Sequence, residues 1–135
     1  MTLTDTGPLV GIIDEDDKHH AACVAALPRS NAPMLTPWPC FTEAMYLLGE
    51  SLGYSGQDDL WKLVDKETLV IHESSLAERA RMRELMAKYK DTPMDLADAS
   101  LVAAAESLDI RRIFTVDSDF VVYRLPGKKS FEIVP

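Results

Sequence analysis

Five acidic residues lie at positions where an α/β protein can use them for chemistry. Two follow short apolar segments that are typical of buried strands, two lie near the expected starts of helices, and one lies two residues after another. In an open α/β sheet, strand carboxyl ends and helix amino ends share one rim, which is where ligands bind. The topology can therefore gather acids that are distant in sequence into one cluster. These residues are Asp5, Glu43, Asp98, Asp117 and Asp119.

Carboxylates gathered this closely repel one another by several kcal/mol unless a positive charge neutralises them. The usual neutraliser for a set of oxygen ligands is a hard divalent cation such as Mg²⁺ or Mn²⁺. An open carboxylate site of this kind suits phosphodiester hydrolysis, because the metal lowers the pKa of a bound water. The sequence has no Ser-His-Asp arrangement, phosphate-binding loop or CxxC motif that would favour another chemistry.

Each acid also has a structural alternative. Asp5 can form a turn before Gly7-Pro8, Glu43 can be a first-turn residue favoured by the helix dipole, and Asp117 or Asp119 can cap a short helix.

The segment Thr92-Pro93-Met94-Asp95 resembles a capping box with proline at the first helical position, which gives Asp95 a structural role that Asp98 lacks. A carboxylate at Asp98, on a largely apolar helix, is costly to bury without a partner. Asp98 is therefore the strongest candidate for a functional acid.

Strand-like and helix-like segments alternate along the chain, which predicts a parallel sheet with helices on both faces. Residues 101–105 are apolar at five consecutive positions, as in a helix packed on several sides, and a tight turn is expected at Asp109. A loop is expected at residues 28–33. The expected strands are 1–5, 34–36, 68–72, 113–116 and 131–134, and the expected helices are 9–13, 19–27, 37–52, 58–66, 75–90 and 93–108.

Length and composition indicate one soluble domain, residues 1–135, with no membrane-spanning run and no signal peptide. Cys23 and Cys40 have no metal-type spacing and are interpreted as reduced core thiols of a cytoplasmic protein. The net charge of −8 disfavours a non-specific nucleic-acid coat, which is normally basic. It is compatible with an acidic site filled by cations, and it suits a cationic protein partner.

Four segments together resemble a PIN-domain ribonuclease of the VapC toxin type, from type II toxin–antitoxin systems. No one segment is decisive, but their order and spacing are specific, and the resemblance covers nearly the whole chain. It implies a three-layer α/β/α sandwich with a short, mainly parallel sheet. The segments are Asp5-Thr6-Gly7-Pro8-Leu9, Thr42-Glu43, Asp98-Ala99 with the apolar run after it, and Thr115-x-Asp117-x-Asp119-Phe120.

The resemblance assigns a role to each acid. It implies that Asp5, Asp98 and Asp117 are the principal ligands of Mg²⁺ or Mn²⁺, that Glu43 holds a metal or its water, and that Asp119 assists. It also implies that Thr115 orients a water or the phosphate. The implied reaction is hydrolysis of RNA.

The resemblance also implies partners: a cognate antitoxin whose tail lies over the site, and a second copy of the chain in a homodimer. Arg79 and Arg83 share a helix face and can hold an RNA backbone. The alternative is that they are solvated charges paired with Glu78 and Glu84.

Two function hypotheses follow. The first is a metal-dependent endoribonuclease, the toxin of a toxin–antitoxin pair. The second is a catalytically silent PIN-like module that binds a protein or RNA, and the complete set of acids disfavours it. A phosphorelay receiver or aspartyl-phosphate hydrolase is rejected, because Gly7 stands where the hydrolase needs a second Asp and the expected strands lack the receiver's Asp and Lys.

Overall fold

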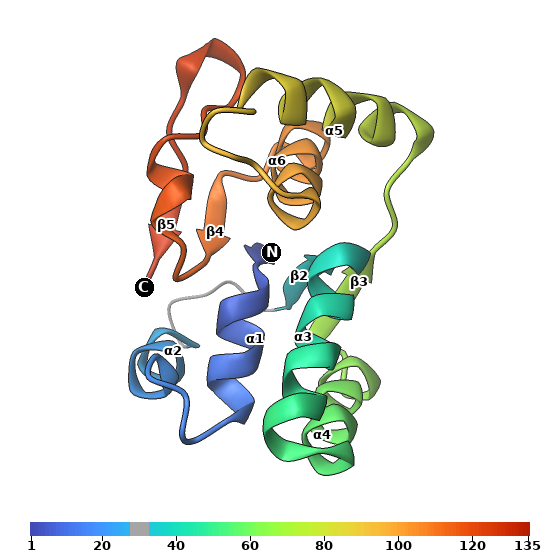
Figure 1. Ribbon diagram of the computed structural model, residues 1–135, viewed down its shortest axis with the longest axis vertical. Coiled ribbons are helices and arrows are strands. Elements are labelled where there is room, and N and C mark those ends of the chain that lie inside the picture. Colours follow the sequence, from blue (N-terminus) through green and yellow to red (C-terminus); the bar gives the residue numbers. More distant parts are fainter. Residues whose placement is uncertain (28–32) are drawn as a thin grey trace.

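The computed structural model describes residues 1–27 and 33–135, so the expected loop at 28–33 lies, apart from Pro33, outside the described residues. Over these residues the chain forms five strands and six α-helices (Figure 1). The strands are β1 (Thr2–Thr4), β2 (Met34–Pro37), β3 (Leu69–His72), β4 (Arg112–Phe114) and β5 (Glu132–Val134). The helices are α1 (Thr6–Ile13), α2 (His20–Ala26), α3 (Trp38–Leu52), α4 (Tyr54–Asp65), α5 (Leu76–Lys88) and α6 (Leu96–Leu108), with short 3-10 turns η2 (Ser118–Val121) and η3 (Pro126–Lys128).

The strands form one sheet in the order β3-β2-β1-β4-β5, and every neighbouring pair is parallel. All five carboxyl ends therefore lie along one edge of the sheet. Helices α5 and α6 lie on one side of the sheet, and α1, α3 and α4 lie on the other (Figure 1). The predicted fold class, a three-layer α/β/α sandwich with a short parallel sheet, is confirmed.

An apolar core fills the space on each face of the sheet. One core includes Leu3, Leu85 and Leu101, and the other includes Leu9 and Phe41. Helix α6 is the most enclosed element, since nine consecutive residues, 97 to 105, are buried. The small alanines of this segment allow α6 to pack against α5, α3 and the sheet together. The expectation of a helix packed on several sides is confirmed, as is the tight turn at Asp109, which has a φ of 53°.

Three helix starts differ from the prediction by three or four residues: those of α1, α4 and α6, the last of which is described with its capping residues below. Helix α1 begins at Thr6, so Gly7 and Pro8 belong to its first turn instead of a separate turn. Proline is tolerated there because the first N–H groups of a helix have no intrahelical partner. Helix α4 begins at Tyr54, four residues early, directly after Gly53, whose φ of 69° lets the chain reverse between α3 and α4.

Two further expectations concern the two cysteines and membrane-spanning helices. Cys23 and Cys40 are buried and free of disulfides, as expected for core thiols. None of the described helices combines the length and the apolar character needed to cross a membrane.

Candidate metal centre

Three of the predicted acids converge at the carboxyl edge of the sheet. Asp5, Asp98 and Asp117 each offer a carboxylate oxygen, and these atoms all lie within 4.8 Å of one another. Asp5 directly follows β1, and Asp117 lies three residues beyond β4, the neighbour of β1 in the sheet. Asp98 comes from the first turn of α6. The three residues line a cavity of about 250 Å³ together with Glu43 and Asp95.

Asp5 is held by the start of its own helix and by Thr115. Its Oδ1 accepts from the Thr6 N–H at 2.7 Å, and its Oδ2 accepts from the Thr115 hydroxyl at 2.8 Å. The same Thr115 oxygen accepts from the Asp117 N–H at 3.0 Å. Thr115 therefore joins two members of the cluster. Sequence reasoning assigned its hydroxyl to a water or a phosphate, but in the structure the hydroxyl proton is donated to Asp5.

The predicted helix-capping role of Asp95 is confirmed, but its position in the capping box was wrong, and so was the prediction that Asp98 has no part in capping. The capping box starts three residues later than expected, with Asp95 as the N-cap and Asp98 as the third helical residue. The Asp98 N–H donates to Asp95 Oδ1 at 2.8 Å, and Asp98 Oδ2 lies 3.5 Å from the Asp95 N–H. Asp98 thus has a local structural role, which the sequence prediction had denied it, and it also reaches the cluster. Asp95 is exposed and caps the amino end of α6.

Sequence reasoning missed the residue that holds Asp98 from the other side. The Tyr123 hydroxyl donates to Asp98 Oδ2 at 3.0 Å, and Tyr123 is completely buried. Burial and the neighbouring Asp98 charge raise the pKa of the Tyr123 phenol, so it stays a donor. The two residues are 25 positions apart. No local pattern around Tyr123 signals this contact.

Two more residues near Asp5 were also missed. The Thr6 hydroxyl lies 3.3 Å from both Glu43 Oε2 and the Cys40 carbonyl oxygen and has one proton to donate, and the Cys40 thiol lies 3.7 Å from Asp5 Oδ1. Burial and then the Asp5 charge raise the pKa of Cys40, which keeps its S–H available as a donor. The position of Thr6 directly after Asp5 is the one sequence signal that indicates its involvement.

The two remaining predicted acids take different positions. Glu43 is exposed on α3, yet it lines the same cavity as the cluster, with its Oε2 3.3 Å from the Thr6 hydroxyl. Asp119 donates its backbone N–H to Asp117 Oδ1 at 2.9 Å, which makes Asp117 the cap of η2, as the sequence allowed. Among the described residues, the Asp119 side chain is not one of the three that converge. Its assisting role stays a prediction.

The cluster is electrostatically strained. Burial raises the pKa of Asp5 to about 6, and the nearby Asp117 and Glu43 charges add to this against hydrogen bonds from Thr6 and Thr115. Burial, followed by the Asp95 charge, raises the pKa of Asp98 to about 7, against the Tyr123 hydrogen bond. Without a compensating positive charge, these groups hold protons at a pH where ordinary carboxyls are ionised.

The donor set fits a hard divalent cation. It consists of carboxylate oxygens, and the described residues that line the cavity include no lysine, arginine or histidine to neutralise them. Hard cations with oxygen ligands are the ions that such a set prefers. A cation here would also remove the strain that raises the two pKa values.

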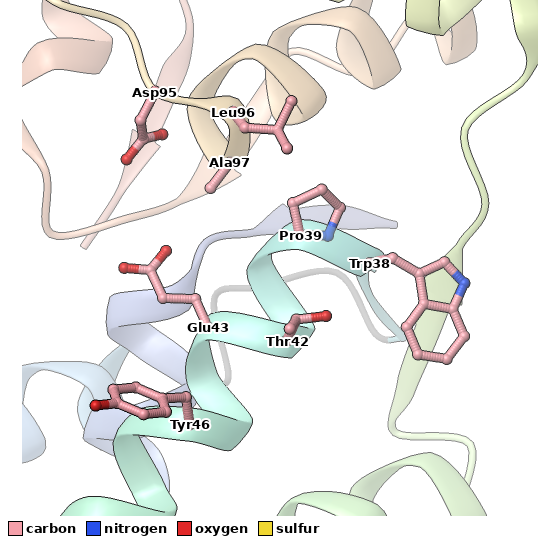
Figure 2. Close-up of a pocket in the computed structure, with 8 residues that line it drawn as sticks. All are labelled: Trp38, Pro39, Thr42, Glu43, Tyr46, Asp95, Leu96 and Ala97. Carbon is pink, nitrogen blue, oxygen red and sulfur yellow. The ribbon is translucent and has the colours of Figure 1, made fainter.

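A larger, mostly apolar cavity of about 780 Å³ adjoins the acids. Figure 2 shows it between the start of α3 and the start of α6, with the carboxylates of Glu43 and Asp95 projecting from opposite sides. Its remaining lining is Trp38, Pro39, Thr42, Tyr46, Leu96 and Ala97, of which Trp38 and Tyr46 are 44% and 64% exposed. A surface of this kind suits an apolar partner segment.

The ion pairs on α5 differ from the predicted ones. Glu84 pairs with Arg81 at 3.1 Å, and Glu78 lies 2.8 Å from the His72 Nε2. Arg79 and Arg83 are exposed, and neither forms an ion pair within the described part of the chain. The predicted pairing of these arginines with Glu78 and Glu84 was therefore wrong, and an RNA contact stays a prediction.

The short parallel sheet is flanked by helices and carries a carboxylate cluster at its carboxyl edge. These features define the class of α/β/α proteins with an acidic site at the sheet edge. The profile of the PIN domain family matches residues 2–125 of the chain. The chain therefore belongs to the PIN domain family.

One sequence relative and two solved structures are similar to nearly the whole chain. Ribonuclease VapC26 of Mycobacterium tuberculosis is 24% identical over 135 residues, which cover 98% of this chain and 99% of the relative. The crystal structure of M. tuberculosis VapC20, described as a sarcin-ricin loop cleaving toxin, covers the whole of both chains with a TM-score of 0.85 and 13% identity. A toxin–antitoxin complex from Klebsiella pneumoniae is similar with a TM-score of 0.72 and 20% identity, over 100% of this chain and 97% of that one. At these identities, the two structures show a shared fold.

Proposed function

We propose that this protein is a metal-dependent endoribonuclease that hydrolyses RNA phosphodiester bonds, and that it is the toxin of a toxin–antitoxin pair. The observation that carries the proposal is the convergence of the Asp5, Asp98 and Asp117 oxygens within 4.8 Å. Membership of the PIN domain family and the full-length similarity to a protein named ribonuclease VapC26 support it.

Asp5, Asp98 and Asp117 would hold Mg²⁺ or Mn²⁺. When bound, such a cation lowers the pKa of a water and stabilises charge on the phosphate oxygens. The protein's own groups fix the geometry: Thr115 orients Asp5, and the α6 capping box fixes the backbone from which Asp98 projects. Glu43 lines the same cavity, with Oε2 3.3 Å from the Thr6 hydroxyl, and its carboxylate would accept a hydrogen bond from the attacking water.

We propose that the apolar cavity between α3 and α6 receives a segment of the antitoxin. Trp38 and Tyr46 offer the exposed apolar surface, and the acids beside them suit a basic residue of the same segment. The net charge of −8 also favours a cationic partner. The similarity to a toxin–antitoxin complex supports this assignment.

Two further proposals concern RNA and the oligomeric state. Arg79 and Arg83, exposed on α5, are proposed to contact the RNA backbone. Replacing both with alanine would then raise KM for RNA and weaken the dependence of that KM on salt concentration, with kcat retained.

The protein is also proposed to form a homodimer, which light scattering after size-exclusion chromatography would test directly.

The deciding experiment is cleavage of a mixed RNA pool with Mn²⁺, Mg²⁺ or EDTA. Three proteins are compared: wild type, Asp98→Asn, and Asp65→Asn as the control, since Asp65 is an exposed aspartate at the end of α4. We expect cutting by wild type and Asp65→Asn with either metal, and none with EDTA or by Asp98→Asn. A fully active, folded Asp98→Asn protein would refute the assignment.

The silent-module hypothesis makes the opposite prediction. A wild-type protein that binds no Mn²⁺ by calorimetry and cuts no RNA would support a PIN-like module that only binds a partner. The three converging carboxylates disfavour it, because a module without metal has no use for this buried repulsion.

A further inference from the structure

We infer that Tyr123 is a positioning residue for the metal centre: its hydroxyl fixes the Asp98 carboxylate so that the opposite oxygen faces the cation. The inference rests on the proposed function of the site. Its basis is the 3.0 Å hydrogen bond from the Tyr123 hydroxyl to Asp98 Oδ2, made inside the protein by a fully buried ring.

The two oxygens of Asp98 have different surroundings. Oδ2 accepts from Tyr123 at 3.0 Å and faces the Asp95 N–H at 3.5 Å. Oδ1 accepts no hydrogen bond from the described residues. A carboxylate tied at one oxygen and open at the other is arranged to bind a cation through the open one. The long Asp95 contact is too weak to hold the carboxylate by itself.

The Tyr123 ring is held in place by other aromatic rings. It packs edge-to-face against Tyr89 at a centroid distance of 5.0 Å and against Phe120 at 5.1 Å. Phe120 in turn packs against Phe131 at 5.5 Å. These rings come from the end of α5, from η2 and from the segment before β5. The hydroxyl is therefore presented to Asp98 by a rigid cluster, which limits the positions that the carboxylate can take.

Losing the hydroxyl should weaken metal binding without dismantling the fold. Phenylalanine at position 123 keeps the ring contacts and removes the donor to Asp98. Groups that orient a metal ligand typically contribute about 10–100-fold in metal affinity or activity. Because the Tyr123 ring is completely buried, RNA cannot reach it, and KM for RNA should stay unchanged while kcat falls.

The test measures Mn²⁺ affinity by calorimetry for wild type, Tyr123→Phe and Tyr89→Phe. Tyr89→Phe is the matched control: its ring belongs to the same cluster, but its hydroxyl accepts from the Arg124 N–H at 3.2 Å and touches no acid of the site. We expect Mn²⁺ to bind Tyr123→Phe about tenfold or more weakly, in the range typical of such groups. Tyr89→Phe should bind Mn²⁺ like wild type.

The rise in Tm on adding Mn²⁺ is a second readout, and it separates weaker metal binding from a loss of stability in Tyr123→Phe. Mn²⁺ that binds only the folded state raises Tm, and the rise grows with the logarithm of its affinity. The rise in Tm on adding Mn²⁺ should therefore shrink in Tyr123→Phe and persist in Tyr89→Phe. Equal Mn²⁺ affinity in wild type and Tyr123→Phe would overturn the inference. A wild type that binds no Mn²⁺ at all would instead overturn the proposed function, so the two failures are distinct.

Discussion

The two ends of helix α6 carry buried or half-buried acids with opposite surroundings. Near its end, Glu106 accepts from Arg81 Nε at 2.8 Å and from Arg81 Nη2 at 3.0 Å, a two-pronged ion pair that ties α6 to α5. At its start, Asp98 lies 6% exposed beside Asp5 and Asp117, and the described residues that line the cavity include no lysine, arginine or histidine. One end is neutralised within the protein and the other is not.

The difference indicates which acids stabilise the protein and which impose a cost. A paired carboxylate such as Glu106 contributes to packing between two helices, and Glu106 raises the pKa of Arg81 by its hydrogen bonds and charge. At the other end, burial first and repulsion from the neighbouring carboxylates second raise the pKa of Asp98 to about 7. An uncompensated cluster of this kind is typical of a site that acts on a ligand.

The sharpest contrast is between Asp5→Asn and Glu106→Gln in RNA cleavage. Asp5→Asn should lower activity by more than about a hundredfold, since even groups that only orient metal ligands cost about 10–100-fold. Glu106→Gln should retain activity within about twofold below its melting temperature, because it alters packing far from the acids. Initial cleavage rates at saturating Mn²⁺ would measure both. Equal losses in the two variants would mean that stability, and not the cluster, limits activity.

Metal affinity should depend on pH at the unpaired end. Because the pKa of Asp5 is about 6 and that of Asp98 about 7, protons compete with the cation below these values. Mn²⁺ affinity should therefore rise more than about tenfold between pH 5 and pH 7.5 and level off above, since metal binding must release the bound protons. Calorimetry across this pH range would measure it. An affinity that stays constant would show that the acids are already ionised at pH 5.

Metal-free stability should respond oppositely at the two ends. The pKa of Asp98 is raised from 3.8 to about 7 on folding, so its cost is absent below pH 4 and fully present above pH 7. Asp98→Asn should then raise the free energy of unfolding at pH 8 by about 1 kcal/mol or more and leave it unchanged at pH 4. Glu106→Gln should lower it by about 1 kcal/mol at pH 8. Urea unfolding in EDTA would measure both. A destabilised Asp98→Asn protein at pH 8 would contradict the assigned strain.

The smallest effect is expected for a substitution at Asp95. This variant tests whether Asp95 is only the N-cap of α6 or also a metal ligand. Asp95→Asn keeps a good N-cap residue, so the free energy of unfolding should change by at most about 0.5 kcal/mol. Mn²⁺ affinity should change less than it does in Asp98→Asn, because Asp95 is exposed and lies outside the three converging acids. Calorimetry on the two variants side by side would decide. Equal losses of Mn²⁺ binding would make Asp95 a ligand.

The amino-acid sequence by itself determined the features that depend on neighbours along the chain. Alternating strand and helix segments predicted the parallel sheet, and the apolar run after Asp98 predicted a buried helix. The positions of Asp5 and Asp117 after strands predicted acids at the carboxyl edge. These predictions succeed because periodicity and position in an element are local properties of the chain.

The tertiary structure decided which of these acids meet and what holds them. Contacts such as Tyr123 with Asp98, Thr115 with Asp5, and Glu106 with Arg81 join segments 25 to 110 residues apart. The sequence prediction started α6 too early, since capping depends on which carboxylate reaches which N–H in the folded loop. Pairing and burial arise only when the layers pack, and they decide whether an acid is neutralised by the protein or left for a cation.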